Sequence, residues 1–386
     1  MKLVRLALVP FALVVVGLVR LLARFGVLVR FGEFWSSRLG HLAANTECYL
    51  CERDAGMHKA IDIWTHHGPI CNRQLAKMWK RCLWIDPTKF TLLVSIVNRM
   101  FQGWEKHTVM PTQLDRDVHN IFEKYPPHLK FTERQERKGQ EGLRRLGIHD
   151  GAKFVCLIVR DDAYLPQLAY HNHRDSEIKD YIAACLALAV RGYYVVRVGA
   201  AVKAPMLVKH TKIIDYATNG KRSEFMDIYL GAKCEFCIST GTGFDAIPYI
   251  FRRPVCYVNY VMIEYLFTFS PKSLAIWKHH VKDGKRMKPA EIFDSDAGQF
   301  PGIDQFKEAG ISLENNAPGE IAALVMEMAE RLNGYPFYDD FEELRQKEFW
   351  RNFPRSISPF NGKPLHGEIR MRIGSEFLEQ YGDKQP

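Results

Sequence analysis

Residues 234–259 read CEFCISTGTGFDAIPYIFRRPVCYVN, and this stretch decides the fold. A short apolar run at 236–238 predicts a strand, and the polar, glycine-containing run at 239–243 predicts a turn. Apolar residues at helical spacing follow over 244–251, until Arg252, Arg253 and Pro254 end the helix. A second apolar strand is expected at 255–258. This strand–turn–helix–strand unit is typical of a parallel α/β sheet.

The turn itself combines two glycines with three hydroxyl side chains. Gly241 and Gly243 allow backbone N–H groups to face outward at a helix N-terminus, and Ser239, Thr240 and Thr242 add hydroxyl donors. Such a turn suits a phosphate or another anion. The same residues are also ordinary turn and N-cap residues, so the interpretation that the turn has a purely structural role remains open. Neither GxxxxGK[ST] nor GxGxxG is present here.

The chain before this stretch repeats the same pattern. Apolar runs at 154–159, 193–198 and 213–214 predict strands, and residues 177–191 and 225–232 predict helices. Short strands with helical crossovers predict a doubly wound sheet. Arg160 follows the first of these strands, at the edge where open α/β sheets bind ligands, and its planar guanidinium suits a diphosphate.

A first globular unit is expected between residues 30 and 126. Gly40 and His41 follow basic and hydroxyl residues and precede a short helix. Histidine is the side chain best suited to accept a proton near neutral pH, although a surface histidine after a turn is the plainer interpretation. Residues 47–51 and 61–64 are read as strands. Residues 72–83 are read as a helix, and 107–150, with a charged helix at 133–146, as a connection.

Residues 1–29 form a hydrophobic and basic segment. An apolar run at 6–19 is preceded by Lys2 and Arg5 and followed by Arg20 and Arg24. A cleaved secretory signal, a single spanning helix and an anchor lying on the membrane surface all fit part of this pattern. We favour association with an anionic membrane surface at its cytoplasmic face, because positive charges flank the run on both sides.

Charge and cysteine content limit the kinds of partner and of metal site that the protein can have. The net charge of +9 fits phosphorylated substrates or an anionic membrane, and no nucleic-acid module or basic arm accompanies it, so no nucleic acid is expected. The pairs Cys48/Cys51 and Cys234/Cys237 have CxxC spacing, but both look strand-like, where residues three apart point to opposite faces. We therefore expect reduced thiols and neither a metal site nor a cofactor. The DxD spacing of Asp294 and Asp296 lies in a polar, loop-like stretch and does not change this expectation.

Several segments resemble, in order, a bacterial family of glycosyltransferases linked to surface polysaccharide and assigned mainly by similarity. The resemblance covers about residues 30–350. It is carried by RLGHLA from Arg38, NTECYL from Asn45, VRDDAYL from Val159, HRDS from His173, GYYVVRVG from Gly192, RSEFMD from Arg222, and the run from Ser239 through Pro254 to Asn259. Cys48 and Cys51 depart from it, because aliphatic residues are expected there.

The resemblance implies a GT-B-like architecture, with two Rossmann-like domains facing across a cleft. It implies transfer of a sugar from a nucleotide-activated donor to a glycan or lipid-linked acceptor, without a metal. The residues expected at the donor are Arg160, Arg197, Arg222, Ser223, Ser239, Thr240, Gly241, Thr242, Gly243 and Glu314. Those expected on the acceptor side are Arg38, Gly40, His41 and Glu47. His41 and Arg160 are the expected catalytic pair.

Two other functions remain open at this point. One is a binding module on the same scaffold that recognises a nucleotide or glycan without turnover, and the other is a nucleotide-sugar epimerase. The expected organisation is a membrane-associating segment at 1–29, an acceptor-side domain with its linker at 30–150, a donor-binding domain at 151–335, and a C-terminal helix and tail at 336–386.

Overall fold

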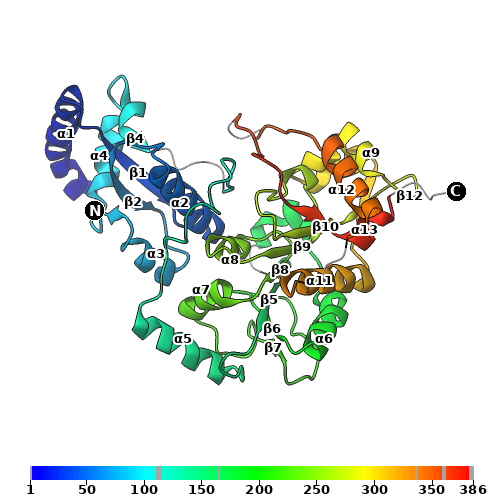
Figure 1. Cartoon of the computed structure of the whole chain (residues 1–386). Helices are drawn as coiled ribbons and strands as arrows, with labels where there is room; N and C mark the ends of the chain where they lie inside the picture. The colour runs from blue at the N-terminus through cyan, green and yellow to red at the C-terminus, as the bar shows by residue number, and fades with distance from the viewer. Residues whose placement is uncertain (1, 110–114, 164–165, 335–337, 359–361, 382–386) are drawn as a thin grey trace. The chain divides into compact units, whose positions relative to one another are not determined.

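The computed structural model describes residues 2–109, 115–163, 166–334, 338–358 and 362–381 (Figure 1). Tyr164 and Leu165, which belong to one of the resembling segments, lie outside these residues. The chain forms two compact units. The first comprises Met1–Asp117 and Ile121–Lys130, and the second comprises Val118–Asn120 and Phe131–Pro386. Each unit is built around its own parallel sheet.

The first unit alternates strands and helices. Its elements are α1 (Lys2–Arg24), β1 (Val29–Trp35), α2 (Leu39–Asp54), β2 (Ile61–His67), α3 (Arg73–Trp79), β3 (Trp84–Ile85), α4 (Phe90–Asn98), η1 (Trp104–His107) and β4 (Thr108–Val109). The strand order is β3-β2-β1-β4, and all pairs are parallel. β1 is therefore central, and α2 begins just beyond its carboxyl end.

One side of this sheet is covered by α1 and α4. Ala12, Val16 and Val19 recur at helical spacing along α1 and are buried in a cluster with Val94 and Val97 of α4. The same cluster includes two residues of β1, Val29 and Phe31. The apolar N-terminal segment is thus a helix, as its composition indicates, and one of its faces belongs to the core of the first unit.

The expectation of a strand at residues 47–51 is wrong, because these residues lie in the middle of α2. Every residue from Leu42 to Glu52 is buried. A helix that is buried on all sides has no separate apolar and polar faces. Its sequence therefore lacks the 3.6-residue hydrophobic period that distinguishes a helix from a strand. The argument that Cys48 and Cys51 point to opposite faces fails with it, since residues three apart in a helix share a face.

The second unit begins with α5 and holds the larger sheet. Its elements up to that sheet's centre are α5 (Glu133–Arg145), β5 (Phe154–Ile158), η2 (Pro166–Arg174), η3 (Ile178–Tyr181), α6 (Ile182–Val190), β6 (Tyr194–Arg197), β7 (Ile213–Asp215), α7 (Glu224–Lys233), β8 (Cys237–Ser239), η4 (Gly243–Asp245) and α8 (Ala246–Ile250). The predicted strand–turn–helix–strand unit is confirmed, with Cys234 capping α7 and Cys237 opening β8.

The remainder of this unit completes the sheet and adds a small antiparallel one. Its elements are β9 (Val255–Tyr260), η5 (Ile263–Tyr265), β10 (Leu274–Trp277), β11 (His279–Lys282), β12 (Lys285–Arg286), α9 (Pro289–Asp294), η6 (Ala297–Gln299), α10 (Ile303–Glu308), β13 (Ile311–Glu314), α11 (Pro318–Leu332), α12 (Asp340–Asn352), β14 (Arg372–Ile373) and α13 (Ser375–Glu379).

The large sheet has the order β14-β10-β9-β8-β5-β6-β7, and its pairs are parallel. After β5 the chain adds β6 and β7 on one side, then returns through α7 to add β8, β9 and β10 on the other. Figure 1 shows α6 and α11 on one face and α7 on the other. The topology therefore has a switch point between β5 and β8, where open parallel sheets leave a crevice for ligands.

The charged helix α5 belongs to the second unit and packs closely on α7. Gly139 and Gly142 make this approach possible, because a Cβ atom at Gly139 would lie 2.2 Å from the ring of Tyr229 and one at Gly142 would lie 2.3 Å from the sulfur of Met226. Thr132 begins the helix with a capping box that includes Gln135.

Candidate functional site

The turn after β8 is held together by its own side chains. Asp245 is buried, and its carboxylate accepts hydrogen bonds from the hydroxyl of Ser239, the hydroxyl of Thr242 at 2.9 Å and the N–H of Thr242 at 2.8 Å. The N–H of Gly241 donates to the Ser239 hydroxyl at 3.0 Å. Burial raises the pKa of Asp245 to about 6, although these donors favour its charged form.

This arrangement differs from the expectation that the turn's N–H groups face outward to an anion. The N–H groups of Gly241 and Thr242 are used inside the turn, and a carboxyl group lies beneath it. Gly241 is nevertheless required for its shape. It has φ +75°, and a Cβ atom there would lie 2.7 Å from the ring of Tyr260.

Cationic side chains gather around the turn instead. The N–H of Arg160, just after β5, donates to the hydroxyl of Thr240 at 2.9 Å, which joins the ends of β5 and β8. The Arg160 guanidinium pairs with Asp175 at 3.1 Å. Arg174 donates to the carbonyl oxygen of Gly241. The predicted residues Arg160, Ser239, Thr240, Gly241, Thr242 and Gly243 are thus brought to one edge of the sheet.

Lys278 completes this edge and was missed by the sequence analysis. It directly follows β10, is only 4% exposed, and its ammonium donates to the backbone carbonyl of Asp175 at 2.6 Å. Burial lowers the pKa of Lys278 to about 8, while the charge of Asp175 works in the opposite direction. The signal for it was a lysine directly after the apolar run at 274–277, but no strand was predicted there. Arg174 was quoted in a resembling segment and given no role.

Cationic and acidic side chains meet at this edge, among them the carboxylates of Asp175 and the buried Asp245. Arg160 and Arg174 contact the turn, and Lys278 joins the same cluster through Asp175, which also pairs with Arg160. The nearby Asp162 carboxylate pairs with Lys203. Burial and its acidic neighbours raise the pKa of Asp175, whereas Arg160 lowers it. A half-buried cluster of cations at a switch point can bind a phosphate or diphosphate group.

Other residues that were predicted to bind the nucleotide-sugar donor have different surroundings. Arg197 ends β6, is 2% exposed, and donates to the carbonyl of Ala204 at 2.7 Å and to Asp215 at 3.3 Å. Arg222 pairs with Asp227 at 2.6 Å. None of the hydrogen bonds or ion pairs recorded for the described residues joins Arg197 or Arg222 to Arg160 or to the glycine turn.

Ser223 and Glu314 also have local roles. Ser223 is the N-cap of α7, where its side chain accepts from the N–H of Met226, and it lines an open groove of about 840 Å³ along α5. Glu314 is an exposed residue that ends β13, in the small sheet β12-β11-β13. There it lies opposite His279 of β11.

In the first unit, the segment after β1 places His41 in the first turn of α2. Arg38 is the N-cap residue and has extended backbone, and Gly40 directly precedes His41. The imidazole Nδ1 of His41 lies 3.3 Å from the side-chain oxygen of Asn45, and the ring meets Trp35 edge-on at 4.7 Å between centroids. Trp35, His41 and Asn45 are among the residues that line a cavity of about 10 Å³, the size of one water molecule.

Glu47 lies elsewhere on α2. It is six residues beyond His41, which is about 9 Å along the helix axis. Its buried carboxylate meets Cys51 and His128. Glu47 therefore contacts a different set of side chains from those around His41.

No family model and no curated protein matches the chain. Among solved structures, it is similar to a family 9 glycosyl transferase from Veillonella parvula DSM 2008, with 14% identity over 60% of this chain and 80% of that chain and a TM-score of 0.36. It is also similar to the ADP-heptose LPS heptosyltransferase II of E. coli, with 13% identity over 59% and 84% and a TM-score of 0.36.

A third similar structure is an iron-containing dodecameric glycosyltransferase from enterotoxigenic E. coli H10407. The identity is 14% over 59% of this chain and 58% of that chain, and the TM-score is 0.31. All three solved structures are glycosyltransferases.

Proposed function

We propose that the chain is a metal-independent, GT-B-like glycosyltransferase with two Rossmann-like domains. It moves a sugar from a nucleotide-activated donor to a glycan or lipid-linked acceptor in bacterial surface polysaccharide synthesis. The observation that carries this proposal is the cluster at the topological switch point of the second unit, where Arg160 and Arg174 contact the turn after β8 and Lys278 joins them through Asp175. The ordered motif resemblance over residues 30–350 supports it.

In this proposal the second unit binds the donor. As the bond between the sugar and the diphosphate breaks, negative charge builds on the leaving nucleotide. Arg160 and Lys278 stabilise that charge at a largely buried edge of the sheet, which is the role a metal takes in other enzymes. Arg160 must turn from Asp175 to reach a phosphate, so the carboxylate holds the guanidinium ready until the donor binds.

The first unit binds the acceptor, and His41 accepts the proton of the attacking hydroxyl. The Nδ1 atom of His41 faces Asn45, which fixes the ring orientation and leaves Nε2 for the acceptor. Arg38 and Gly40, beside it at the start of α2, are the proposed acceptor contacts. Arg197, Arg222, Ser223 and Glu314 have mainly local partners in the structure, so we give them no direct role at the diphosphate.

We also propose that α1 associates with the cytoplasmic face of the membrane. In the described part of the chain, α1 is the one helix long and apolar enough to cross a bilayer, with a mean hydropathy of 2.1 over Ala7–Arg24. Its outer face exposes Phe11, Val14 and Leu18, and Phe25, the residue that directly follows the helix, is exposed as well. This location brings the enzyme close to a lipid-linked acceptor.

A thermal-shift screen of the full chain against nucleotides and nucleotide sugars tests the donor site. ADP-D-β-D-heptose, which is present in the solved structure of a similar heptosyltransferase, is one of the probes. A ligand at 100 times its dissociation constant stabilises a fold by about 2.7 kcal/mol. We expect a shift with one nucleotide family that is lost in Arg160→Ala and Lys278→Met. The shift should be kept in Arg191→Ala, which removes an exposed arginine that directly follows α6 and pairs with Glu330 of α11.

Turnover then separates the three functions. A transferase releases free nucleotide only when an acceptor is present, a binding module releases none, and an epimerase changes the sugar without an acceptor. The absence of any shift in a folded sample, with and without acceptor glycans, would contradict the transferase proposal.

A further inference from the structure

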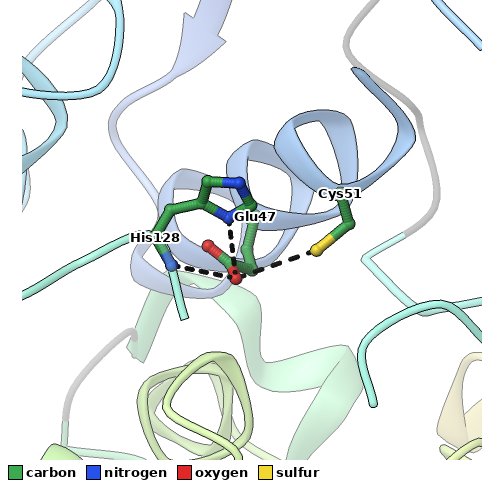
Figure 2. Close-up of side chains that lie close together, drawn as sticks. All are labelled: Glu47, Cys51 and His128. Atoms are coloured by element: carbon green, nitrogen blue, oxygen red, sulfur yellow. Dashed lines mark hydrogen bonds and ion pairs between the residues drawn. The ribbon is translucent and has the colours of Figure 1, made fainter. Parts of the chain in front are cut away.

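A second cluster of chemically active side chains lies in the first unit, on α2. Glu47 and Cys51 are one helical turn apart and project from the same face, and His128 approaches them from the segment Ile121–Lys130 (Figure 2). The Sγ atom of Cys51 lies 3.8 Å from Oε1 of Glu47, and Nδ1 of His128 lies 3.2 Å from the same oxygen. The three ligand atoms all lie within 4.8 Å of one another.

These separations fit a single metal ion. With metal–oxygen and metal–nitrogen bonds of about 2.0 Å and a metal–sulfur bond of about 2.3 Å, tetrahedral geometry sets O···N at about 3.3 Å and O···S at about 3.5 Å. The observed 3.2 Å matches the first value, and the observed 3.8 Å differs from the second by a few tenths of an ångström. The third separation, between Nδ1 of His128 and Sγ of Cys51, lies within 4.8 Å, and the sulfur must move toward the imidazole for both to bind one ion.

The surroundings of His128 are those of a metal ligand. Its second ring nitrogen, Nε2, lies 2.9 Å from a carboxylate oxygen of Asp54, the last residue of α2. A histidine that binds a metal through one nitrogen commonly donates the N–H of the other to a carboxylate, which fixes its tautomer and orientation. Asp54 supplies that carboxylate and leaves Nδ1 directed at Glu47.

Burial makes a cation at this place favourable. Glu47 and Cys51 are fully buried, and His128 is mostly buried. A buried carboxylate needs a compensating positive charge. An imidazolium between Glu47 and Asp54 supplies one, and the Cys51 thiol then donates only a weak hydrogen bond to Glu47. The thiol that contacts the same carboxylate oxygen favours a metal, because oxygen, nitrogen and sulfur together form a ligand set typical of zinc.

We propose that Glu47, Cys51 and His128 bind one Zn²⁺ ion, with Asp54 as the positioning residue for His128. Binding takes the thiolate form of Cys51, so its thiol proton is released to solvent. Three protein ligands leave one coordination position for water. The ion fastens the segment Ile121–Lys130 to α2, the helix whose first turn carries His41. This proposal does not rest on the transferase function.

Zinc binding by the full chain tests the site. After removal of metal with a chelator, Zn²⁺ is titrated against a chromophoric indicator, and Co²⁺ is used as a spectroscopic probe for thiolate ligation. Cys51→Val removes the sulfur and leaves the Glu47–His128–Asp54 contacts in place. Cys71→Ser is the matched control, because it removes a thiol of the same unit that lies outside the cluster.

We expect the wild type and Cys71→Ser to bind one equivalent of Zn²⁺, to show a thiolate-to-cobalt absorption band and to melt at a higher temperature with Zn²⁺. Cys51→Val should lose the band and the stabilisation. Asp54→Asn should bind Zn²⁺ about 10- to 100-fold more weakly. Absence of stoichiometric binding by the wild type, or equal binding by Cys51→Val, overturns the proposal in favour of a plain ion-pair network. Metal-free melting temperatures show whether each variant is folded.

Discussion

Lys278 is the cation whose charge is set most clearly by its surroundings. Its lowered pKa of about 8 means that it is charged at neutral pH and loses its proton as the pH rises to 9. We therefore predict that the affinity for a nucleoside diphosphate falls between pH 7 and 9. Lys278→Met should bind about 10- to 100-fold more weakly at pH 7, because it loses a charged hydrogen bond of about 1.5–3 kcal/mol.

Calorimetric titration at three pH values measures this effect. The decisive comparison is the slope of affinity against pH, which should be reduced in Lys278→Met. If that variant keeps the wild-type slope, another group controls the pH dependence and Lys278 lies outside the donor site.

A second prediction for a single residue concerns Asp245 and the free energy of unfolding. Its pKa is raised from the usual 3.8 to about 6, so the folded state holds its proton more tightly than the unfolded state does. Its contribution to stability is complete below about pH 4 and is lost as the pH rises to about 6, by up to about 3 kcal/mol. Asp245→Asn should remove this part of the pH dependence.

Urea unfolding of the wild type and Asp245→Asn between pH 4 and 7 measures the difference. The exposed Asp304→Asn serves as the control, since its side chain is 78% accessible. Parallel stability curves for wild type and Asp245→Asn would show that the Asp245 carboxyl is not shifted.

The position of a single residue could be predicted where strand order determines it, and could not be predicted where a side-chain contact does. Arg160 and Thr240 could be placed together from sequence, because both follow strands that pair in a parallel sheet. Arg197 also ends a strand, yet it turns to Asp215 at the end of the next strand, a choice that strand position alone does not decide. The bonds inside the turn depend on Asp245, six residues after Ser239, and no motif marks that contact.

At the scale of elements, the packing of α5 on α7 gives a prediction. Alanine normally stabilises a helix relative to glycine by about 1 kcal/mol. At Gly139 the new methyl group would meet the Tyr229 ring, so we predict that Gly139→Ala destabilises the second unit by about 1–3 kcal/mol. Gly319→Ala in α11 is the matched control, because a Cβ atom there meets nothing within 4 Å.

Thermal unfolding monitored by circular dichroism measures both variants. The melting temperature should fall for Gly139→Ala and stay equal or rise for Gly319→Ala. Equal behaviour of the two would mean that α5 and α7 can move apart at little cost.

Features of the individual helices explain why α2 was predicted wrongly and α5 correctly. α5 begins with a capping box at Thr132 and is rich in charged residues, so residues 133–146 were predicted almost to their observed end at Arg145. α2 is buried on every side and has no side-chain cap, so no such signal marked it as a helix. That error also hid the i, i+4 relation of Glu47 and Cys51, on which the metal proposal depends.

At the scale of the whole molecule, α1 must satisfy two environments. Its inner face, with Ala12 and Val16, is part of the core of the first unit. A spanning orientation would pull this face away and expose Val94 and Val97 to water, at a cost of about 1.5–3 kcal/mol for each large side chain. We infer that α1 lies along the membrane surface while packed on α4, so the full chain is the right material for experiments.

We predict that the outer and inner faces of α1 respond differently to substitution. Serine at Phe11, Leu18 and Phe25, which are 55–77% exposed, should release the protein from anionic vesicles with little change in melting temperature. Losing three apolar anchors should lower vesicle affinity more than 10-fold. Val16→Asp should instead unfold the first unit, because it places a charge in the core. Val190→Ser, an exposed apolar site on α6, is the control that should leave both properties unchanged.

Flotation with vesicles of neutral and anionic lipid, together with melting curves, separates the two orientations. A helix that lies on the surface leaves the bilayer when its outer face becomes polar, and its inner face stays packed on α4. A helix that spans the bilayer would place Val16 against lipid, so Val16→Asp would weaken membrane attachment and leave the melting of the first unit unchanged. That result would mean that α1 separates from α4 when the protein binds the membrane.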